Sequence, residues 1–243
     1  MPIERPILFS GPMVRATLED RKTHTRRTMR PQPAPGFLKR GVVGVVPQWP
    51  MQDGVRWFMA DGCSELIKCP YGKPGDRLWV REEHYRIGHW EEVPGVKTKG
   101  RRQKWKFVAD SDEVRFDPPA SFRKGRHHND PGTITWHKRL ARFMFRKHSR
   151  ITLEITGIRV ERLNDISEDD AKSEGIEGRF HPNDPQLWTW KDYGRSKVFK
   201  EEIFHYGSSV TPKSTFQSLW QSINGPKSWD ENPYVWVIEF KKV

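Results

Sequence analysis

The chain has 243 residues and a formal net charge of +12 at pH 7. This length suits one large domain or two small ones, and the charge favours an anionic partner, most simply nucleic acid. No apolar run approaches the roughly 20 residues of a membrane-spanning helix, which excludes a membrane protein of that type.

The two cysteines, Cys63 and Cys69, predict neither a disulfide framework nor a metal site. Three histidines could complete a zinc site with them, but the spacing matches no zinc motif; they are His127, His128 and His148. The first residues do not resemble a signal peptide. We therefore expect a soluble chain in a reducing cytoplasm, with no metal, no cofactor and no membrane partner.

The first third of the chain predicts a strand, a helix and a loop. Residues Pro6 to Phe9 are typical of a short strand, and Gly11-Pro12 then begins a helix with proline in its first turn. Pro31 to Pro50 is rich in Pro and Gly, which predicts a loop or an edge hairpin. Val55 to Met59 predicts another strand.

The middle of the chain predicts a turn, a strand and a long insertion. Pro70 to Asp76 forms the turn, and Arg77 to Glu82 leaves it as a strand. Residues 91–133 are polar and predict an irregular segment, apart from a strand around Trp105 to Val108.

The segment that begins at Ile151 predicts two strands and a short helix. Ile151 to Ile155 alternates apolar and polar residues, and Ile158 to Leu163 predicts a second strand, paired or bent back through Gly157. Ser167 precedes three acidic residues and predicts a helix N-cap, and Gly175 lies where that helix would end.

The last third predicts the clearest helix and a final strand. Ser214 to Ile223 places four apolar residues at helical spacing, namely Phe216, Leu219, Trp220 and Ile223. Asn224-Gly225 ends this helix. Tyr234 to Phe240 alternates cleanly and predicts a well-packed strand that closes the fold. Residues 177–210 are a mixed segment.

These elements predict an α+β fold that is mostly β. Short strands outnumber helices, and one antiparallel sheet curled into a small barrel with helices at its rim accounts for their order. We expect a single domain over residues 1–243, with insertions near 31–68, 91–135 and 177–210.

The segment from Asp20 to Arg27 reads Asp-Arg-Lys-Thr-His-Thr-Arg-Arg. Its Lys22 and Thr25, three residues apart, can meet around one small site. A lysine of lowered pKa can act as a base, and a threonine beside a base can act as a nucleophile. Arg26 and Arg27 would hold an anionic backbone close by. The alternative is a basic turn with solvated cations and a capping hydroxyl.

Residues 121–150 hold nine Lys or Arg residues against one acidic residue, Asp130. Four aromatic residues are interleaved with these cations: Phe122, Trp136, Phe143 and Phe145. Cations and aromatic faces suit phosphates and unstacked bases, so we predict salt-dependent binding of single-stranded nucleic acid. The residues we expect to carry it are Arg142, Arg146 and Lys147. The alternative is a solvated loop with a few core aromatics.

The segment from Asp20 to Arg27 resembles the signature of ASCH domains, which belong to the PUA-like barrels. Gly75 to Glu82 resembles the strand that these domains place next. Ile151 to Gly175, followed by Trp236 to Phe240, resembles their later strands and the helix between them. The resemblance extends over about half of the chain and is greatest to the long ASCH proteins of tailed phages and prophages. It implies a PUA-like β-barrel and, for a phage protein, the cytoplasm of a bacterial host.

The ASCH signature usually reads Gly-x-Lys-x-x-Glu-x-Arg, whereas this chain has Asp20 at the glycine place and Thr25 at the glutamate place. The segment is more similar to that of the small bacterial enzymes that hydrolyse N(4)-acetylcytidine, which have Asp-Arg-Lys-Thr-x-Thr there. The site of those enzymes is a Lys, a Thr and a Glu. The resemblance therefore implies catalytic roles for Lys22, Thr25 and Glu174, the last within a loosely similar helix segment.

Cleavage of an N-acylated cytosine needs a nucleophile, a base and a proton for the departing amine. Thr25 can be the nucleophile or can orient a water, Lys22 can be the base, and Glu174 can return the proton or hold Lys22. We expect Arg27 and Trp79 at the wall of the same pocket.

Two alternatives use the same pocket. The first is a non-catalytic module that holds a modified base, RNA or DNA beside the barrel, with Lys22, Arg27, Trp79 and Arg81 lining the site. The second is a ribonuclease, in which Lys22 and Arg27 stabilise the charge of a phosphorane. The three hypotheses differ in whether Thr25 and Glu174 matter.

Overall fold

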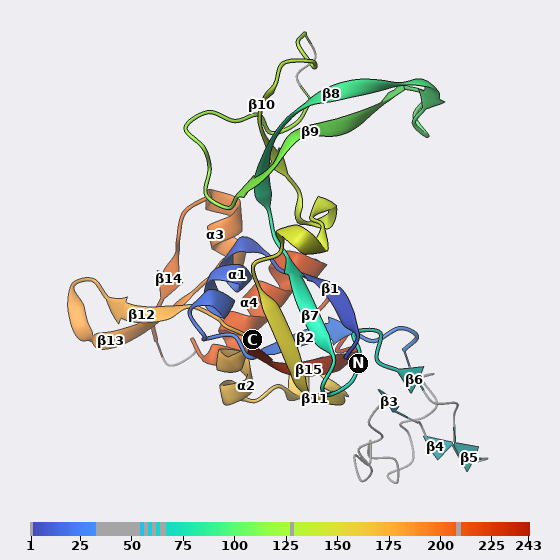
Figure 1. Cartoon of the computed structure of the whole chain (residues 1–243). Coiled ribbons are helices and arrows are strands. Elements are labelled where there is room, and N and C mark those ends of the chain that lie inside the picture. Colours follow the sequence, from blue (N-terminus) through green and yellow to red (C-terminus); the bar gives the residue numbers. More distant parts are fainter. Residues whose placement is uncertain are drawn as a thin grey trace. The chain divides into compact units, whose positions relative to one another are not determined.

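The computed structural model describes residues 2–32, 54–55, 58–59, 62–63, 67–126, 129–207 and 210–243 (Figure 1). The contacts within the chain divide it into two compact units. The first unit comprises residues 1–5, 12–78 and 151–243, and the second comprises residues 6–11 and 79–150. The second unit thus contains the segment 91–135, which we interpreted as an insertion into one domain.

The fold is α+β with more strand than helix, as the sequence predicts. Four α-helices are found among the described residues: α1 (Gly11–Leu18), α2 (Glu168–Ser173), α3 (Tyr193–Phe199) and α4 (Pro212–Asn224). None of these helices has the length and apolar character that crossing a bilayer would need.

The main sheet has five strands in the order β1-β7-β11-β15-β2. Their bounds are β1 (Glu4–Leu8), β7 (Arg77–Arg81), β11 (Thr152–Arg162), β15 (Tyr234–Lys242) and β2 (His24–Thr28). β15 pairs antiparallel with β11 on one side and with β2 on the other. β1 and β2 are the two edges of this order, so the described strands do not form the closed barrel that we predicted.

β15 is an inner strand of the main sheet. Its alternation was predicted correctly, but the residues on both of its faces are buried as far as Ile238. Val235, Trp236, Val237 and Ile238 are all 1 % exposed or less. The predicted apolar face of α4 is buried at Phe216, Leu219 and Trp220. Ile223, in its last turn, is instead 58 % exposed.

Two of the predictions for the first unit need correction. β11 is one strand with a register shift between Ile155 and Gly157, rather than two separate strands. A Cβ at Gly157 would lie only 2.7 Å from Oε2 of Glu239, so the position takes glycine and the strand continues. The mixed segment 177–210 contains α3 and a three-stranded sheet of β12 (Gly178–His181), β13 (Asp184–Lys191) and β14 (Phe204–His205).

The second unit is built on an antiparallel sheet in the order β10-β8-β9. Its strands are β8 (His84–Lys97), β9 (Gln103–Arg115) and β10 (Thr135–Arg139), and β8 and β9 form one long hairpin (Figure 1). The expected irregular segment is therefore regular as far as residue 115. From Pro94 to Lys97 β8 is exposed on both faces, whereas β9 alternates half-buried and exposed residues from Gln103 to Phe107, where we predicted a strand.

The buried part of this sheet contains histidines as well as aromatic rings. Trp90, Phe107 and His137 meet edge to face, with ring centroids 5.4 to 6.1 Å apart. His84 and His137 are 0 % exposed. Burial lowers the pKa of His84 to about 4, so this ring is neutral at physiological pH.

Most of the predicted segment 31–68 lies outside the described residues. Within it the structure describes two antiparallel strand pairs, β3 with β6 and β4 with β5. These strands are β3 (Gly54–Val55), β4 (Phe58–Met59), β5 (Gly62–Cys63) and β6 (Ile67–Lys68). The strand predicted over residues 55–59 thus falls on parts of two short strands.

Candidate functional site

The structure brings the octet from Asp20 to Arg27 against the end of α2. After α1 the chain turns at Asp20, whose φ is 57°, and Lys22 then forms an isolated antiparallel bridge with Glu174. Ser167 caps α2 by accepting a hydrogen bond from the Asp170 amide, and Gly175 has a φ of +82°, so both predicted ends of the helix are confirmed. Lys22 is 4 % exposed and Glu174 is 3 % exposed.

The Lys22 ammonium is completely surrounded by oxygen acceptors. Nζ donates to the carbonyl oxygens of His24 and Glu174, both at 2.8 Å, and to Oε2 of Glu174 at 2.9 Å. A lysine ammonium has three donors, and these three acceptors occupy all of them. A protonated Lys22 therefore has no donor left for a substrate phosphate.

Burial lowers the pKa of the Lys22 amine below its ordinary value, and the charges of Arg27 and Arg26 act in the same direction. The carboxylate of Glu174 opposes this shift and does not cancel it. The neutral amine, which is the form that can accept a proton, is thus more accessible here than in a solvated lysine.

Arg26 holds the same glutamate from the other side. Its guanidinium donates to Oε1 of Glu174 at 3.1 Å, to Oδ2 of Asp170 at 2.9 Å and to Oε1 of Glu161 at 2.9 and 2.5 Å. The Arg26 side chain is 0 % exposed. We predicted that Arg26 contacts the substrate; the structure places its guanidinium among three carboxylates inside the unit.

A second arginine extends this cluster of charges. Arg159 on β11 donates to Glu161 at 3.1 Å, to Asp170 at 2.6 Å and to Glu239. Burial alone would raise the pKa of Asp170, but Arg159 and Arg26 outweigh it and hold the pKa below its usual value. The cluster fixes the position of α2 and hence of Glu174.

Thr25 lies on the opposite face of β2 from Arg26, because successive side chains of a strand alternate. The residue is 4 % exposed. Its hydroxyl has no hydrogen-bond partner among the described residues, and no hydrogen bond joins it to Lys22. Of the three predicted catalytic residues, the structure thus joins Lys22 and Glu174 directly and leaves the Thr25 hydroxyl unbonded.

The other predicted wall residues are divided between the two units. Arg27 follows Arg26 on β2, and its charge is near enough to Glu174 for each to affect the other electrostatically. Trp79 and Arg81 belong to the second unit, where the Arg81 guanidinium lies over the Trp79 ring, 4.6 Å from its centroid.

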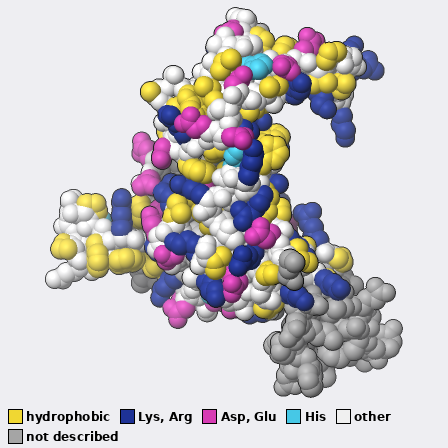
Figure 2. Space-filling model, in the orientation of Figure 1, with side chains coloured by type: hydrophobic (Ala, Val, Ile, Leu, Met, Phe, Trp, Pro, Cys, Tyr) yellow, Lys and Arg dark blue, Asp and Glu magenta, His cyan; other side chains and the backbone are white. Residues whose placement is uncertain are grey.

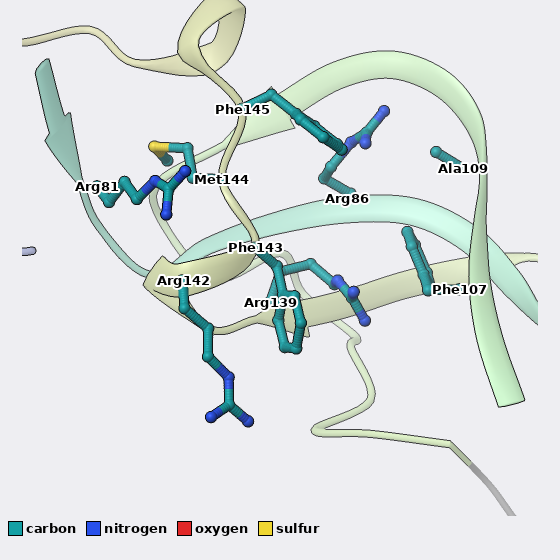
Figure 3. Close-up of a pocket in the computed structure, with 9 residues that line it drawn as sticks. All are labelled: Arg81, Arg86, Phe107, Ala109, Arg139, Arg142, Phe143, Met144 and Phe145. Atoms are coloured by element: carbon teal, nitrogen blue, oxygen red, sulfur yellow. The ribbon is translucent and has the colours of Figure 1, made fainter. Parts of the chain in front are cut away.

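The predicted nucleic-acid-binding residues Arg142, Arg146 and Lys147 also belong to the second unit. Lys147 is paired with Asp112 at 2.6 Å, on the exposed side of the unit. Arg142 lines a cavity together with three further arginines, and of these only Arg81 was singled out from the sequence (Figure 3). The others, Arg86 and Arg139, come from β8 and β10.

The first unit has a cavity of its own beside the octet. It has a volume of about 480 Å³ and includes Arg21, the neighbour of Lys22, among its lining residues. The three predicted catalytic residues line neither this cavity nor the one around Arg142.

The side chains of Cys63, His127 and His128 lie outside the described residues. Cys69 is buried with a free thiol. Among the residues that are described, no group of three His, Cys, Asp or Glu side chains is placed to hold a metal ion.

Comparison with protein families, with curated proteins and with solved structures gives no match to this chain. The site is therefore interpreted from its own residues and from the resemblance of the octet. Sequence reasoning missed Glu161 and Arg159 because only the fold brings β11 beside α2. Charged residues at alternate positions of an otherwise apolar strand, as at Arg159 and Glu161, were the available signal.

Gly175 sets the distance between the octet and α2, which gives a first prediction. A Cβ at Gly175 would lie 2.7 Å from both Ala16 Cβ and Lys22 Cβ, and the backbone has a φ of +82°. We expect Gly175→Ala to lower the free energy of unfolding by about 2 to 4 kcal/mol, from steric overlap and backbone strain together. Urea denaturation measures the loss.

Gly225→Ala is the matched control, because Gly225 also has a positive φ (103°) but no atom within 4 Å of a built Cβ. It should lose only the strain component, on the order of 1 kcal/mol. Equal losses for the two variants would contradict the close approach of Gly175 to Lys22.

Proposed function

We propose that the chain is a metal-independent amidohydrolase that removes an acyl group from the exocyclic amine of N(4)-acylated cytidine or a related modified nucleoside. The observation that carries this proposal is the buried contact between Lys22 and Glu174, two residues 152 positions apart. The resemblance to the acetylcytidine hydrolases had named both residues from separate segments. The same resemblance motivates the proposal that the main sheet and its helices are a PUA-like fold of the ASCH kind.

The reaction requires Lys22 in its neutral form. The amine takes the proton of the attacking hydroxyl, either that of Thr25 or that of a water which Thr25 orients. The hydroxyl oxygen bonds to the acyl carbon, and the carbon–nitrogen bond breaks as a proton returns to the cytosine nitrogen. If Thr25 is the nucleophile, water then hydrolyses the acyl ester. The sum is one amide and one water giving a carboxylic acid and an amine.

The position of Glu174 suits the return of the proton. Its carboxylate contacts Lys22 through one oxygen and Arg26 through the other, so it can relay a proton from the lysine while the arginine holds it. The Thr25 hydroxyl has no hydrogen-bond partner among the described residues, so a substrate that reached it would displace no bond. In apo sites, catalytic hydrogen bonds are often long and shorten only when substrate binds.

The structure favours this reaction over the ribonuclease alternative. A phosphorane-stabilising lysine must offer donors to phosphate oxygens, and the three donors of Lys22 already have protein acceptors. A non-catalytic binding module would bind an anionic ligand best with a charged lysine at its surface. It does not require a buried lysine whose pKa is lowered by burial beside a glutamate.

Incubation with a set of candidate substrates tests this proposal. The protein is incubated with N(4)-acetylcytidine, N(4)-benzoylcytidine and unmodified single-stranded RNA in ¹⁸O-labelled water, and the products are weighed by mass spectrometry. We expect cytidine without label, a carboxylic acid with one labelled oxygen, and intact RNA. Uridine that carries the label would show that water attacks the ring carbon instead. Cleaved RNA would indicate a ribonuclease. No product from any substrate would favour the non-catalytic binding module.

A further inference from the structure

The second unit contains a cavity with a volume of about 420 Å³. β7, β8, β9 and β10 contribute to it, together with the segment of residues 142–145 that follows β10 (Figure 3). Four of its lining residues are arginines and three are phenylalanines: Arg81, Arg86, Arg139, Arg142, Phe107, Phe143 and Phe145. Its lining includes no acidic residue among those that the structure describes.

The positive charge of this cavity is poorly neutralised by the protein itself. Within the described part of the chain, only Arg86 among the four arginines has a carboxylate near it, Asp112 at 3.7 Å. This contrasts with Arg26, which has three carboxylates around one guanidinium. Burial and the charge of Arg86 together lower the pKa of Arg139 to about 10. A bound anion would relieve this repulsion.

Two of the arginines also present donors that lack acceptors. The Nε–H groups of Arg81 and Arg86 are buried, and neither has a hydrogen-bond partner among the described residues. Arg86 is 8 % exposed as a whole residue. Buried donors in native proteins are nearly always satisfied, so these two groups need an acceptor, a water or a ligand atom, that the described residues do not supply.

Two of the phenylalanines that line the cavity are exposed. Phe143 is 47 % exposed and Phe145 is 61 % exposed, although large apolar side chains are usually covered. Arg139 and Arg142 each lie 5.0 Å from the Phe143 ring centroid. The Phe145 ring has only one ring neighbour among the described residues, His148 at 6.1 Å.

We propose that this cavity binds a segment of single-stranded nucleic acid, with the arginines on its phosphates and an unstacked base against Phe143 or Phe145. Guanidinium groups match phosphate oxygens, and aromatic faces stack on any base. An acidic peptide would use the cations and leave the exposed rings without a partner. The site lies in the second unit and is independent of the chemistry at Lys22.

The hairpin of β8 and β9 provides the matched control. Its end carries Lys97, Lys99, Arg101, Arg102 and Lys104, which gather in a separate basic patch (Figure 2). The cavity variant carries Arg81→Gln and Arg142→Gln. The hairpin variant carries Lys99→Gln and Arg102→Gln, so each variant loses two positive charges. The net charge of the chain therefore changes equally in the two double variants.

Fluorescence anisotropy with labelled single-stranded RNA and DNA, from roughly 50 to 200 mM salt, measures the affinity and its salt slope. The cavity variant should bind on the order of 10-fold more weakly, with a slope flatter by about 1.4, whereas the hairpin variant should change far less. Phe143→Ala with Phe145→Ala should weaken binding about 5-fold or more with the slope unchanged.

Tighter binding of RNA or of DNA would show which kind of single-stranded nucleic acid the cavity prefers, and either result supports the proposal. Equal loss in the cavity and hairpin variants would overturn it, because charge alone would then explain the binding. Polyglutamate that competes as well as the oligonucleotide would overturn it in favour of an acidic protein partner. Failure of the acyl-cytidine assay alone would leave this site standing, since no catalysis enters the measurement.

Discussion

Replacing Lys22 with methionine is expected to lower kcat/KM for deacylation of an N(4)-acylated cytidine by about 10²- to 10⁴-fold, the usual contribution of a general base. Glu174→Gln should cause a loss of the same order, because the amide cannot relay a proton. Methionine keeps most of the lysine's volume, and Glu174 retains its contact with Arg26 at 3.1 Å, so the fold should survive.

The controls come from neighbouring residues of the same types. Lys172→Met removes a lysine from α2 whose side chain is 54 % exposed and paired only with Asp169, and should leave the rate unchanged. Thr25→Val should abolish most of the activity, whereas Thr23→Val, at an exposed position, should not. Full activity in Lys22→Met, with thermal unfolding unaltered, would refute the catalytic role.

The pH profile separates a proton-accepting Lys22 from a structural one. The amine accepts a proton only when neutral, so the rate should rise with pH. Because burial lowers its pKa, this rise should occur below the pH range where a free lysine titrates. In Lys22→Met the pH-dependent rise should be absent. If Lys22 were purely structural, its replacement would instead lower the rate by the same factor at every pH.

The local features of the fold could be predicted because their causes are local. Ser167 accepts from the amide three residues on, Gly175 takes a positive φ, and the spacing of Phe216, Leu219 and Trp220 covers one helix face. The outer part of β8 could not, because its residues from Pro94 to Lys97 are exposed on both faces. A strand that is exposed on both sides leaves no hydrophobic period in the sequence.

The candidate site was predictable only in part, for a different reason. Lys22 and Glu174 were paired by resemblance, since no local pattern connects residues 152 positions apart. Arg26 was expected at the substrate because an arginine beside Thr25 could hold an anionic backbone. Its actual partners, Glu161 and Asp170, come from a strand and a helix that only the assembled sheet brings to β2.

The burial of Arg26 leads to the largest expected effect on stability. Arg26→Met should lower the free energy of unfolding by about 3 to 5 kcal/mol, because it removes a fully buried cation from three carboxylates that Arg159 and Lys22 only partly neutralise. The Arg26 side chain is 0 % exposed, and Glu161, Asp170 and Glu174 all depend on it. Urea denaturation followed by tryptophan fluorescence measures the change.

Arg15→Met is the matched control, since the Arg15 side chain is 54 % exposed and lies 3.6 Å from Glu177. It should cost less than about 1 kcal/mol, as exposed ion pairs do.

The pH dependence of the difference between Arg26→Met and the natural chain identifies its cause. The pKa of Asp170 is held below its usual value in the folded chain, so this carboxylate adds stability above its unfolded pKa of 3.8 and loses it as pH falls. Without Arg26, Asp170 takes up a proton at higher pH, and its charge then no longer opposes burial. The stability gap should therefore be full at pH 7 and should shrink as pH falls toward about 4. A gap that is equally large at both pH values would point to lost packing around Phe216, whose ring lies 5.8 Å from the Arg26 guanidinium, rather than to unpaired charge.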